Sequence, residues 1–337
     1  MTNADEKKKK TNFDIDKLTN INGFEFLTAN LPTQQFAIDQ LIYKNCANFI
    51  IGKPQSSKSY LALKMAIDIC CGKATFNLFD TEKGSVLYID EENPLQQIQP
   101  RLKGLAFSVK DKKDLENLHF YNYTDLKLHN KNIKALREII EKHKPKVVVL
   151  DSAIRFLVGK ENESSDVAVF TNHLKSLMAK YNCTFIVLHH TTKSAEAHLD
   201  AMRGSGEFGA FPRSILHISK SGHGQGAKFS LIQVKNSYAE ECEALTYKFV
   251  TKHSGQEIDL KIVAKKTAPY IFETIADDIK AWIVDTKQKS FKRSDVEEAL
   301  KDKNYSTPSI KNALNHLKEE KVISGNKVYT VDVFSDE

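Results

Sequence analysis

Cysteine is scarce in this sequence and follows no recognisable pattern. The five cysteines are an odd number, and no two of them have the C-x-x-C spacing of a zinc or redox site. They are Cys46, Cys70, Cys71, Cys183 and Cys242. This usage argues against a disulfide framework and a structural zinc site, and it is typical of a reducing compartment.

Long apolar runs are also missing. No stretch approaches the roughly 18 apolar residues that a membrane-spanning helix needs, and the polar N-terminus does not resemble a signal peptide. We therefore expect a cytoplasmic protein without membrane contact. The 337 residues are 41% hydrophobic and 27% charged, which suits one large globular domain and a small one. A net charge of +6 permits nucleic-acid binding without requiring it.

The segment from Phe49 to Tyr60 is the most informative part of the chain. It reads as a short apolar strand, a tight loop and a helix that begins near Lys58. Gly52, Lys58 and Ser59 fit the phosphate-binding loop pattern G-x-x-x-x-G-K-[ST]. In such a loop, backbone N–H groups face a phosphate, the lysine reaches the β- and γ-phosphates, and the hydroxyl ligates Mg²⁺. The predicted nucleotide-binding residues here are Gly52, Lys53, Pro54, Gln55, Ser56, Ser57, Lys58, Ser59 and Tyr60.

Ser57 departs from this pattern, because it occupies the position of the second glycine. A Cβ at this position crowds the point where the backbone approaches phosphate, a cost that glycine avoids. The substitution leaves open that the site binds nucleotide weakly or turns it over slowly. Because the other site residues are of the right type, we expect the site to be catalytically active.

Apolar strands and amphipathic helices alternate along the first 190 residues. Strands are predicted at 84–90, 119–122, 146–151 and 184–188, and helices at 60–70, 95–102, 132–142 and 167–181. This alternation predicts an α/β fold with a largely parallel sheet covered by helices on both faces. Ligands of such sheets bind at the carboxyl ends of the strands. Lys58, Glu92, Asp151 and His190 all fall there, which predicts one shared site, although each carboxylate alone is more typical of a surface or cap.

The pattern changes after residue 193. Strands at 214–219, 227–234, 245–250 and 257–263 are predicted to form an antiparallel extension, with Gly222, Gly224 and Gly226 in a hairpin turn.

Three short helices and a hairpin are predicted from residue 276 onward, an order typical of a winged helix-turn-helix domain. The helices are 276–286, 294–302 and 308–321, and the hairpin is 322–331. Residues 276–337 carry 11 Lys and Arg against 12 Asp and Glu, whereas a DNA reader normally has a basic face. DNA contact and protein contact that stabilises a ring therefore both remain open.

Six motifs resemble, in order and spacing, the RecA-fold ATPases related to RepA-type hexameric plasmid replicative helicases. They are Gly52–Ser59, Val86–Pro94 with Arg101 and Leu102, Val147–Ser152, Val187–Lys193, Met202–Gly206 and Val234–Tyr238. The resemblance covers roughly residues 22–265. It implies a RecA-like P-loop ATPase domain at 22–268, preceded by a basic tail at 1–21 and followed by the winged helix-turn-helix domain at 271–337. We expect the tail to be disordered, as a solvated terminus or as an electrostatic arm for DNA.

The resemblance also implies roles within one subunit. Glu92 looks like the glutamate that polarises the attacking water, and its spacing from Leu87 favours it over Glu91. Asp151 looks like the aspartate that holds Mg²⁺ through water, together with the Ser59 hydroxyl.

Three further basic residues resemble sensors and interface groups. His190 is similar to the histidine that senses the γ-phosphate, with His189 as the alternative. Arg203 resembles the arginine finger that one subunit supplies to its neighbour's ATP, and Lys235 resembles a second cation at that interface. An arginine in trans implies a homo-oligomer, and the resemblance implies a hexameric ring.

The implied activity is ATP hydrolysis coupled to DNA translocation or unwinding, most typical of a replicative helicase of a plasmid, phage or mobile element. Loops at 156–166 and 194–207 would face single-stranded DNA in a central channel. These loops and their flanks hold Arg155, Lys160, Lys193, Phe208 and Phe211, but also several acidic residues. An ATP-gated DNA-binding replication initiator or regulator without unwinding activity is the alternative.

Overall fold

The computed structural model describes most of the chain in ten segments. They are residues 22–28, 33–129, 132–192, 202–222, 227–254, 257–266, 275–301, 307–319, 322–326 and 328–331. The predicted tail at 1–21, Lys193 and the predicted domain boundary near 268–271 lie outside these segments. Helix α1 (Gly23–Thr28) belongs to a first unit, residues 1–34, and all other elements belong to a second unit.

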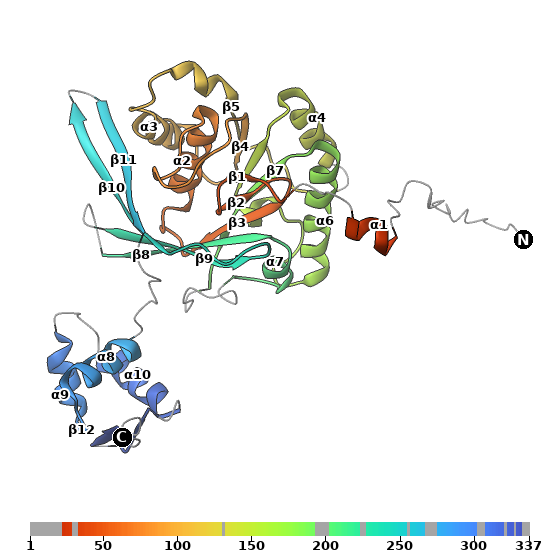
Figure 1. Cartoon of the computed structure of the whole chain (residues 1–337). Helices are drawn as coiled ribbons and strands as arrows, with labels where there is room; N and C mark the ends of the chain where they lie inside the picture. The colour runs from red at the N-terminus through yellow and green to blue at the C-terminus, as the bar shows by residue number, and fades with distance from the viewer. Residues whose placement is uncertain are drawn as a thin grey trace, which may run out of the picture. The chain divides into compact units, whose positions relative to one another are not determined.

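A nine-stranded sheet forms the centre of the second unit among the described residues (Figure 1). Its order is β11-β10-β9-β8-β3-β7-β6-β4-β5. The strands are β3 (Ala47–Gly52), β4 (Val86–Asp90), β5 (Leu118–Asn122), β6 (Val147–Asp151), β7 (Thr184–His190), β8 (Ser214–Ser221), β9 (Lys228–Asn236), β10 (Leu245–Ser254) and β11 (Glu257–Lys266). All neighbours from β8 to β5 pair in parallel, and β9, β10 and β11 continue the sheet antiparallel. The predicted α/β fold with a largely parallel sheet is therefore confirmed.

One strand differs from its prediction. β8 was expected to be wholly antiparallel, but it pairs in parallel with β3 and antiparallel with β9. The reason is the position at which β8 begins. The N–H of Arg213, the residue before β8, donates to the carbonyl of Ala47, the first residue of β3, at 2.9 Å. β8 therefore starts beside the start of β3.

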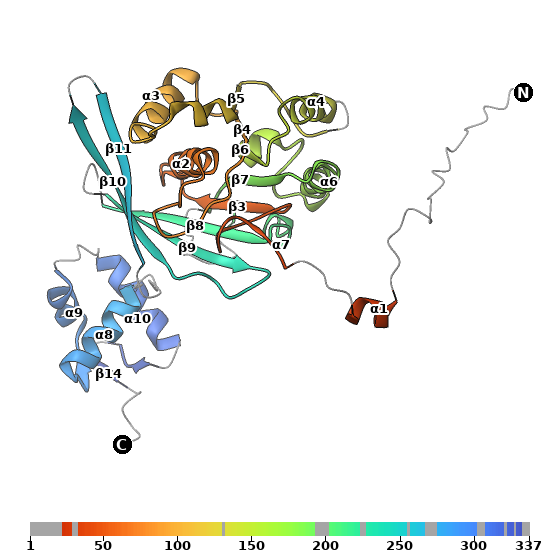
Figure 2. The same ribbon diagram turned by 45° about the horizontal axis from the view of Figure 1, so that its top comes forward.

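Helices cover both faces of the sheet, as Figure 2 shows. Helix α2 (Lys58–Cys71) and α3 (Leu95–Leu105) pack on one face, and α3 also lies beside β11. On the other face lie α4 (Ile133–His143), α5 (Ala153–Phe156), α6 (Ser164–Tyr181) and α7 (Glu207–Ala210). Every residue of β3, β4 and β6 is buried because both faces are covered. The carboxyl ends of these strands are thus set in a rigid frame.

Two smaller groups of elements complete the second unit. Residues before β3 form a hairpin of β1 (Phe36–Ile38) and β2 (Ile42–Tyr43), and a 3₁₀ turn, η2 (Lys112–Asn117), precedes β5. The C-terminal elements are α8 (Ile275–Thr286), β12 (Ser290–Phe291), α9 (Arg293–Ala299), α10 (Thr307–Glu319), β13 (Ile323–Ser324) and β14 (Tyr329–Val331). They bury their own apolar cluster, which includes Ile279, Val296, Leu314 and Tyr329. The predicted hairpin is present, and β12 adds a third strand that the sequence did not predict.

All five cysteines are free thiols. Within the described segments, no helix combines the length and the apolar character needed to cross a lipid bilayer.

Candidate nucleotide-binding site

The loop between β3 and α2 depends on a close approach of two strands. A Cβ on Gly52 would lie 2.5 Å from the Ile218 carbonyl oxygen of β8 and 2.5 Å from Ser56 Oγ. Only glycine therefore fits where β3 ends and the loop begins. Helix α2 then starts at Lys58, as predicted.

Ser57 is the N-cap residue of α2 and has a left-handed backbone, with φ 69° and ψ 23°. Gln55 also has a positive φ, 64°. Left-handed backbone is costly for residues with a Cβ, and glycine adopts it freely. The sequence suggested only that a Cβ at Ser57 crowds phosphate; the backbone supplies a second reason why this loop pattern prefers glycine.

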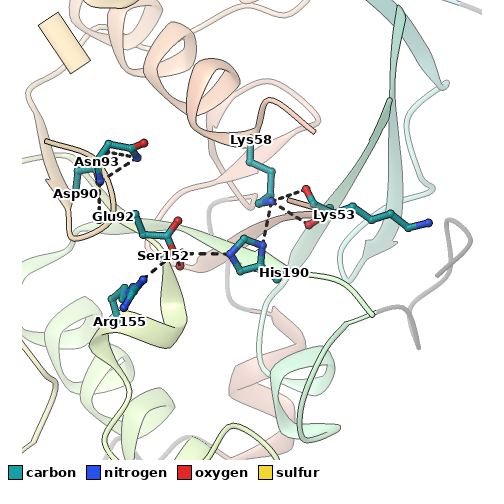
Figure 3. Close-up of polar contacts among 9 residues, drawn as sticks. Lys53, Lys58, Asp90, Glu92, Asn93, Ser152, Arg155 and His190 are labelled. Carbon is teal, nitrogen blue, oxygen red and sulfur yellow. Dashed lines mark hydrogen bonds and ion pairs between the residues drawn. The ribbon is translucent and has the colours of Figure 1, made fainter. Parts of the chain in front are cut away.

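The Lys58 ammonium lies at the centre of the loop (Figure 3). Its Nζ donates to the carbonyl oxygens of Gly52 at 2.9 Å and Lys53 at 3.0 Å, and it lies 3.4 Å from His190 Nδ1. Burial lowers the pKa of Lys58 to about 8, although the charges of Asp151 and Glu92 oppose this shift. The loop thus holds the Lys58 cation against backbone carbonyl oxygens, and the oxygens of a bound phosphate would replace these partners.

Asp151 lies at the carboxyl end of β6 and is buried beside Asp90 of β4, its register partner. Tyr88 Oη donates to Asp151 Oδ2 at 3.2 Å, and the Ser59 side chain is also hydrogen-bonded to Asp151. Burial, together with the charge of Asp90, raises the pKa of Asp151 to about 7. The two carboxyl groups lie close together beside the start of helix α2, and a bound cation would reduce the repulsion between them.

These residues fit Mg²⁺ bound in the way that is usual for nucleotide enzymes. Mg²⁺ commonly takes one or two protein oxygens and completes its octahedron with water and phosphate. In the part of the chain that the structure describes, no group of three or more His, Cys, Asp or Glu could hold a metal by itself. Ser59 and Asp151 would hold the ion, which supplies positive charge at the phosphates.

A tight turn after β4 orients Glu92. Asp90 Oδ1 accepts from the backbone N–H groups of Glu92 at 2.8 Å and Asn93 at 2.7 Å. Asn122 Nδ2 of β5 donates to the carbonyls of Asp90 at 2.8 Å and Asn93 at 2.6 Å. The turn is therefore fixed by both neighbouring strands, and Glu92 projects from it toward Ser152 and His190 (Figure 3).

Three groups surround Glu92 Oε1. Ser152 Oγ donates to it, His190 Nε2 lies 3.7 Å away, and Arg155 Nε lies 3.8 Å away. His190, Ser152 and Arg155 hold the pKa of Glu92 down at about 2, against the opposing effect of burial. The His190 ring lies between the two charged groups, with Nδ1 3.4 Å from Lys58 Nζ and Nε2 facing this carboxylate. Lys58, His190 and Glu92 form a continuous polar chain.

Glu91 has a different environment from Glu92. Its carboxylate accepts from the Thr124 N–H at 2.8 Å, the Thr124 hydroxyl and the Asp125 N–H at 3.2 Å. Glu91 therefore stabilises the turn after β5, and the geometry favours Glu92 as the residue near the phosphates.

The two adjacent histidines, His189 and His190, also have different environments. His189 is buried, its Nε2 lies 2.6 Å from the Arg203 carbonyl oxygen, and its ring centroid is 4.4 Å from that of Phe208. Burial lowers the pKa of His189 to about 4. His189 thus joins β7 to the following loop, whereas His190 contacts Lys58 and Glu92.

The side chains of Arg203 and Lys235 contact residues outside this polar chain. Arg203 Nε lies 2.5 Å from Glu161 Oε1, its side chain is 60% exposed, and its N–H donates to the His190 carbonyl at 3.1 Å. Lys235 Nζ donates to the carbonyls of Gly209 at 2.9 Å and Ala210 at 2.8 Å, at the C-terminal end of α7. The structure thus brings Arg203 near the strand ends and fixes Lys235 to α7.

The remaining predicted loop residues divide by exposure. Lys53, Pro54 and Gln55 are exposed, and Ser56 is buried. The Tyr60 ring lies 4.9 Å from the Arg101 guanidinium and 5.3 Å from the Phe249 ring.

Sequence reasoning missed four residues of this site. Asp90 and Asn93 flank Glu92, and an aspartate that opens a turn after a strand was the signal available for them. Ser152 and Arg155 follow Asp151 directly, and Arg155 was expected to serve only a DNA-facing loop. Their contact with Glu92 depends on β4 and β6 being neighbours, which no local pattern reveals.

A phosphate-binding loop at the end of the central parallel strand β3, with Asp151 and Asp90 at the ends of β6 and β4 along the same edge of the sheet, is typical of a P-loop ATPase domain of the RecA-like type. The chain belongs to the AAA_25 family of AAA domains, whose model matches residues 17–196. Among solved structures, it is similar to the flagellar accessory protein FlaH from Methanocaldococcus jannaschii, with 15% sequence identity and a TM-score of 0.44. That similarity covers 67% of this chain and 92% of FlaH.

Proposed function

We propose that this protein is a ring-forming, ATP-hydrolysing motor on DNA, of the replicative helicase type. The observation that carries the proposal is the polar chain from Lys58 through His190 to Glu92, which ends on an ionised carboxylate. Phosphoryl transfer needs positioned cations and an oriented water more than covalent chemistry. Lys58 supplies positive charge, Glu92 orients the water, and Ser59 and Asp151 hold Mg²⁺. His190 contacts both Lys58 and Glu92, and it therefore couples phosphate binding at Lys58 to the position of Glu92.

The exposure of Arg203 supports a role across a subunit interface. This arginine extends from the loop after β7, and its partner Glu161 belongs to the loop after α5. Gly204 keeps the two loops close, since a Cβ there would lie 2.5 Å from the Glu161 carbonyl oxygen. An exposed arginine held near the strand ends is suited to stabilise charge on a neighbour's ATP. Such a head-to-tail contact closes into a ring, for which we propose six subunits.

DNA is the proposed substrate because of the exposed stretch at 158–165, which follows α5 and adjoins the loop of Arg203. It carries the exposed Lys160 and Glu163 and the half-buried Glu161, and the exposed Arg155 precedes it on α5. Cations of this kind suit backbone tracking of a single strand in a ring channel. The ATP-gated initiator or regulator remains the second candidate, since the mixed charge of this stretch is also compatible with binding that is not coupled to unwinding.

We assign the C-terminal elements to a winged helix-turn-helix domain that contacts duplex DNA. Helices α8, α9 and α10 with the β12-β14-β13 sheet have the order of that motif. Lys311 and Asn315 of α10 are exposed, whereas Lys318 donates to Asn326 Oδ1 at 2.7 Å and lies over Tyr329. Deleting 271–337 should abolish duplex binding and leave ATP turnover intact. Loss of the ring with DNA binding retained would instead assign this domain to assembly.

ATP hydrolysis measured with and without single-stranded DNA, alongside the mass of the assembly, tests the proposal. We expect turnover that increases with DNA and a mass of about six chains when ATP is present. Turnover that ignores DNA, in a protein that stays monomeric, would contradict it.

A further inference from the structure

Arg155 occupies a position between the nucleotide site and solvent. It lies on α5, three residues beyond Ser152, and its side chain is 60% exposed although its Nε is 3.8 Å from Glu92 Oε1. Ser152 Oγ donates to the same oxygen, and His190 Nε2 faces it too. One carboxylate oxygen is therefore surrounded by three polar groups, of which the arginine is exposed and the Ser152 side chain is buried.

The chain after Arg155 connects to the exposed arginine of the next loop. The Glu161 carboxylate forms an ion pair with Arg203 Nε, and the Glu161 backbone carbonyl accepts from the Ser205 N–H at 2.7 Å. Ser164 Oγ and Ser205 Oγ lie 2.8 Å apart. The segment from Ser152 to Ser164 thus contacts Glu92 at one end and the Arg203 loop at the other. A ligand that binds its exposed middle is well placed to act on Glu92.

We propose that Arg155 is a positioning residue that restrains Glu92 until a phosphodiester backbone takes over its guanidinium. This inference rests on the proposed action on DNA and names how DNA would regulate the ATP site. The guanidinium fork matches phosphate oxygens as well as carboxylates, so one arginine can exchange between the two. An exposed ion pair is weak, and a chain of phosphates can therefore displace it.

The direction of the effect follows from the basicity of Glu92. Its pKa is held at about 2 mainly by His190 and Ser152, with a smaller contribution from Arg155, and a carboxylate so stabilised accepts poorly from a water molecule. Departure of Arg155 removes one of these groups and leaves the carboxylate freer to turn toward the attacking water. The restrained state is slow, and the DNA-bound state is fast.

Substitution of Arg155 tests whether this residue restrains Glu92 or supports its role in catalysis. Arg155→Ala should raise kcat without DNA roughly two- to fivefold, the scale expected for loss of an exposed ion pair, with little change in the KM for ATP. A single-stranded oligothymidylate should then stimulate this variant little further. Arg155→Lys should keep a low basal rate and a partial response, because a lysine retains the charge without the fork. Lys180→Ala is the matched control, since Lys180 is 57% exposed and pairs with Glu141 on the α4–α6 surface.

Each outcome has a distinct meaning. A lower basal rate in Arg155→Ala, with Lys180→Ala unchanged, would show that Arg155 supports Glu92 and would overturn the restraint. An unchanged basal rate with full stimulation by oligothymidylate would also overturn it. A raised basal rate in a protein whose wild type neither binds nor responds to oligothymidylate would keep the restraint, but would refute DNA as its releasing ligand together with the proposed function.

Discussion

At the scale of single residues, the adjacent glutamates Glu91 and Glu92 face different partners because Asp90 fixes the turn after β4 in which both lie. We predict that Glu92→Gln keeps nucleotide binding and loses turnover by about 10²-fold or more, since the amide cannot act as the proton acceptor. Glu91→Gln is the matched change one residue away, and it should leave turnover within about threefold while lowering the thermal midpoint by weakening the Thr124 contacts. Steady-state hydrolysis and titration with a fluorescent ATP analogue distinguish them. Wild-type turnover in Glu92→Gln would show that another group orients the water.

Ser57 offers a second test at this scale. Because its φ is 69°, Ser57→Gly should relieve backbone strain and stabilise the fold by about 1 kcal/mol, while allowing phosphate to approach more closely. Nucleotide affinity should increase by up to about tenfold on the same energy scale. Ser56→Gly is the control, because Ser56 is outside the positive-φ set and should only lose stability. Unchanged or weaker nucleotide binding by Ser57→Gly would mean that the loop already accommodates serine at no cost.

At the scale of secondary-structure elements, β7 and β8 flank β3 and each carries a buried histidine opposite Ile51. His189 pairs in register with Ile51 on one side, and His217 does so on the other. Burial lowers the pKa of both histidines to about 4. Neutral imidazoles buried in the fold must take up protons when the chain unfolds at acidic pH. Their contribution to stability is fully present above pH 6.5 and is lost as the pH falls toward 4.

His217→Leu should remove part of this acid sensitivity. Its two ring nitrogens have no hydrogen-bond partner among the described residues, so leucine breaks no bond. The loss in unfolding free energy between pH 7 and pH 5 should shrink by about 1–2 kcal/mol relative to wild type in urea titrations. His189→Leu should instead be destabilised at both pH values, since it loses the contact with the Arg203 carbonyl. An equal acid sensitivity of His217→Leu and wild type would contradict the neutral buried state of His217.

The elements that sequence periodicity could identify are those with strong local patterns. The strands at β4, β6 and β7 were predicted because apolar runs end at Asp90, Asp151 and His190, and helix α2 was predicted because the loop pattern defines its start. The parallel pairing of β8 could not be predicted, because it depends on Arg213 lying beside Ala47, a residue far away in the sequence. β12 has only two residues, too few for a period. The same limit applies to the site, where Arg155 reaches Glu92 through strand adjacency.

At the scale of the whole molecule, the proposed ring makes one active site out of two chains. Lys58→Ala and Arg203→Ala should each be nearly inactive, since an arginine acting in trans contributes about 10³-fold or more to turnover. When the two variants are mixed and exchange subunits, some interfaces combine an intact Lys58 with an intact Arg203, and activity should partly return. Exchange verified by mass without recovery of hydrolysis would assign Arg203 to its own subunit.

Strand displacement on a forked DNA duplex tests the central claim most directly. The account predicts that the wild-type protein separates the strands with ATP, that Glu92→Gln binds the fork without separating it, and that rates of displacement follow rates of hydrolysis. Hydrolysis that responds to DNA while the fork stays intact under all conditions would contradict the helicase assignment and favour the ATP-gated regulator.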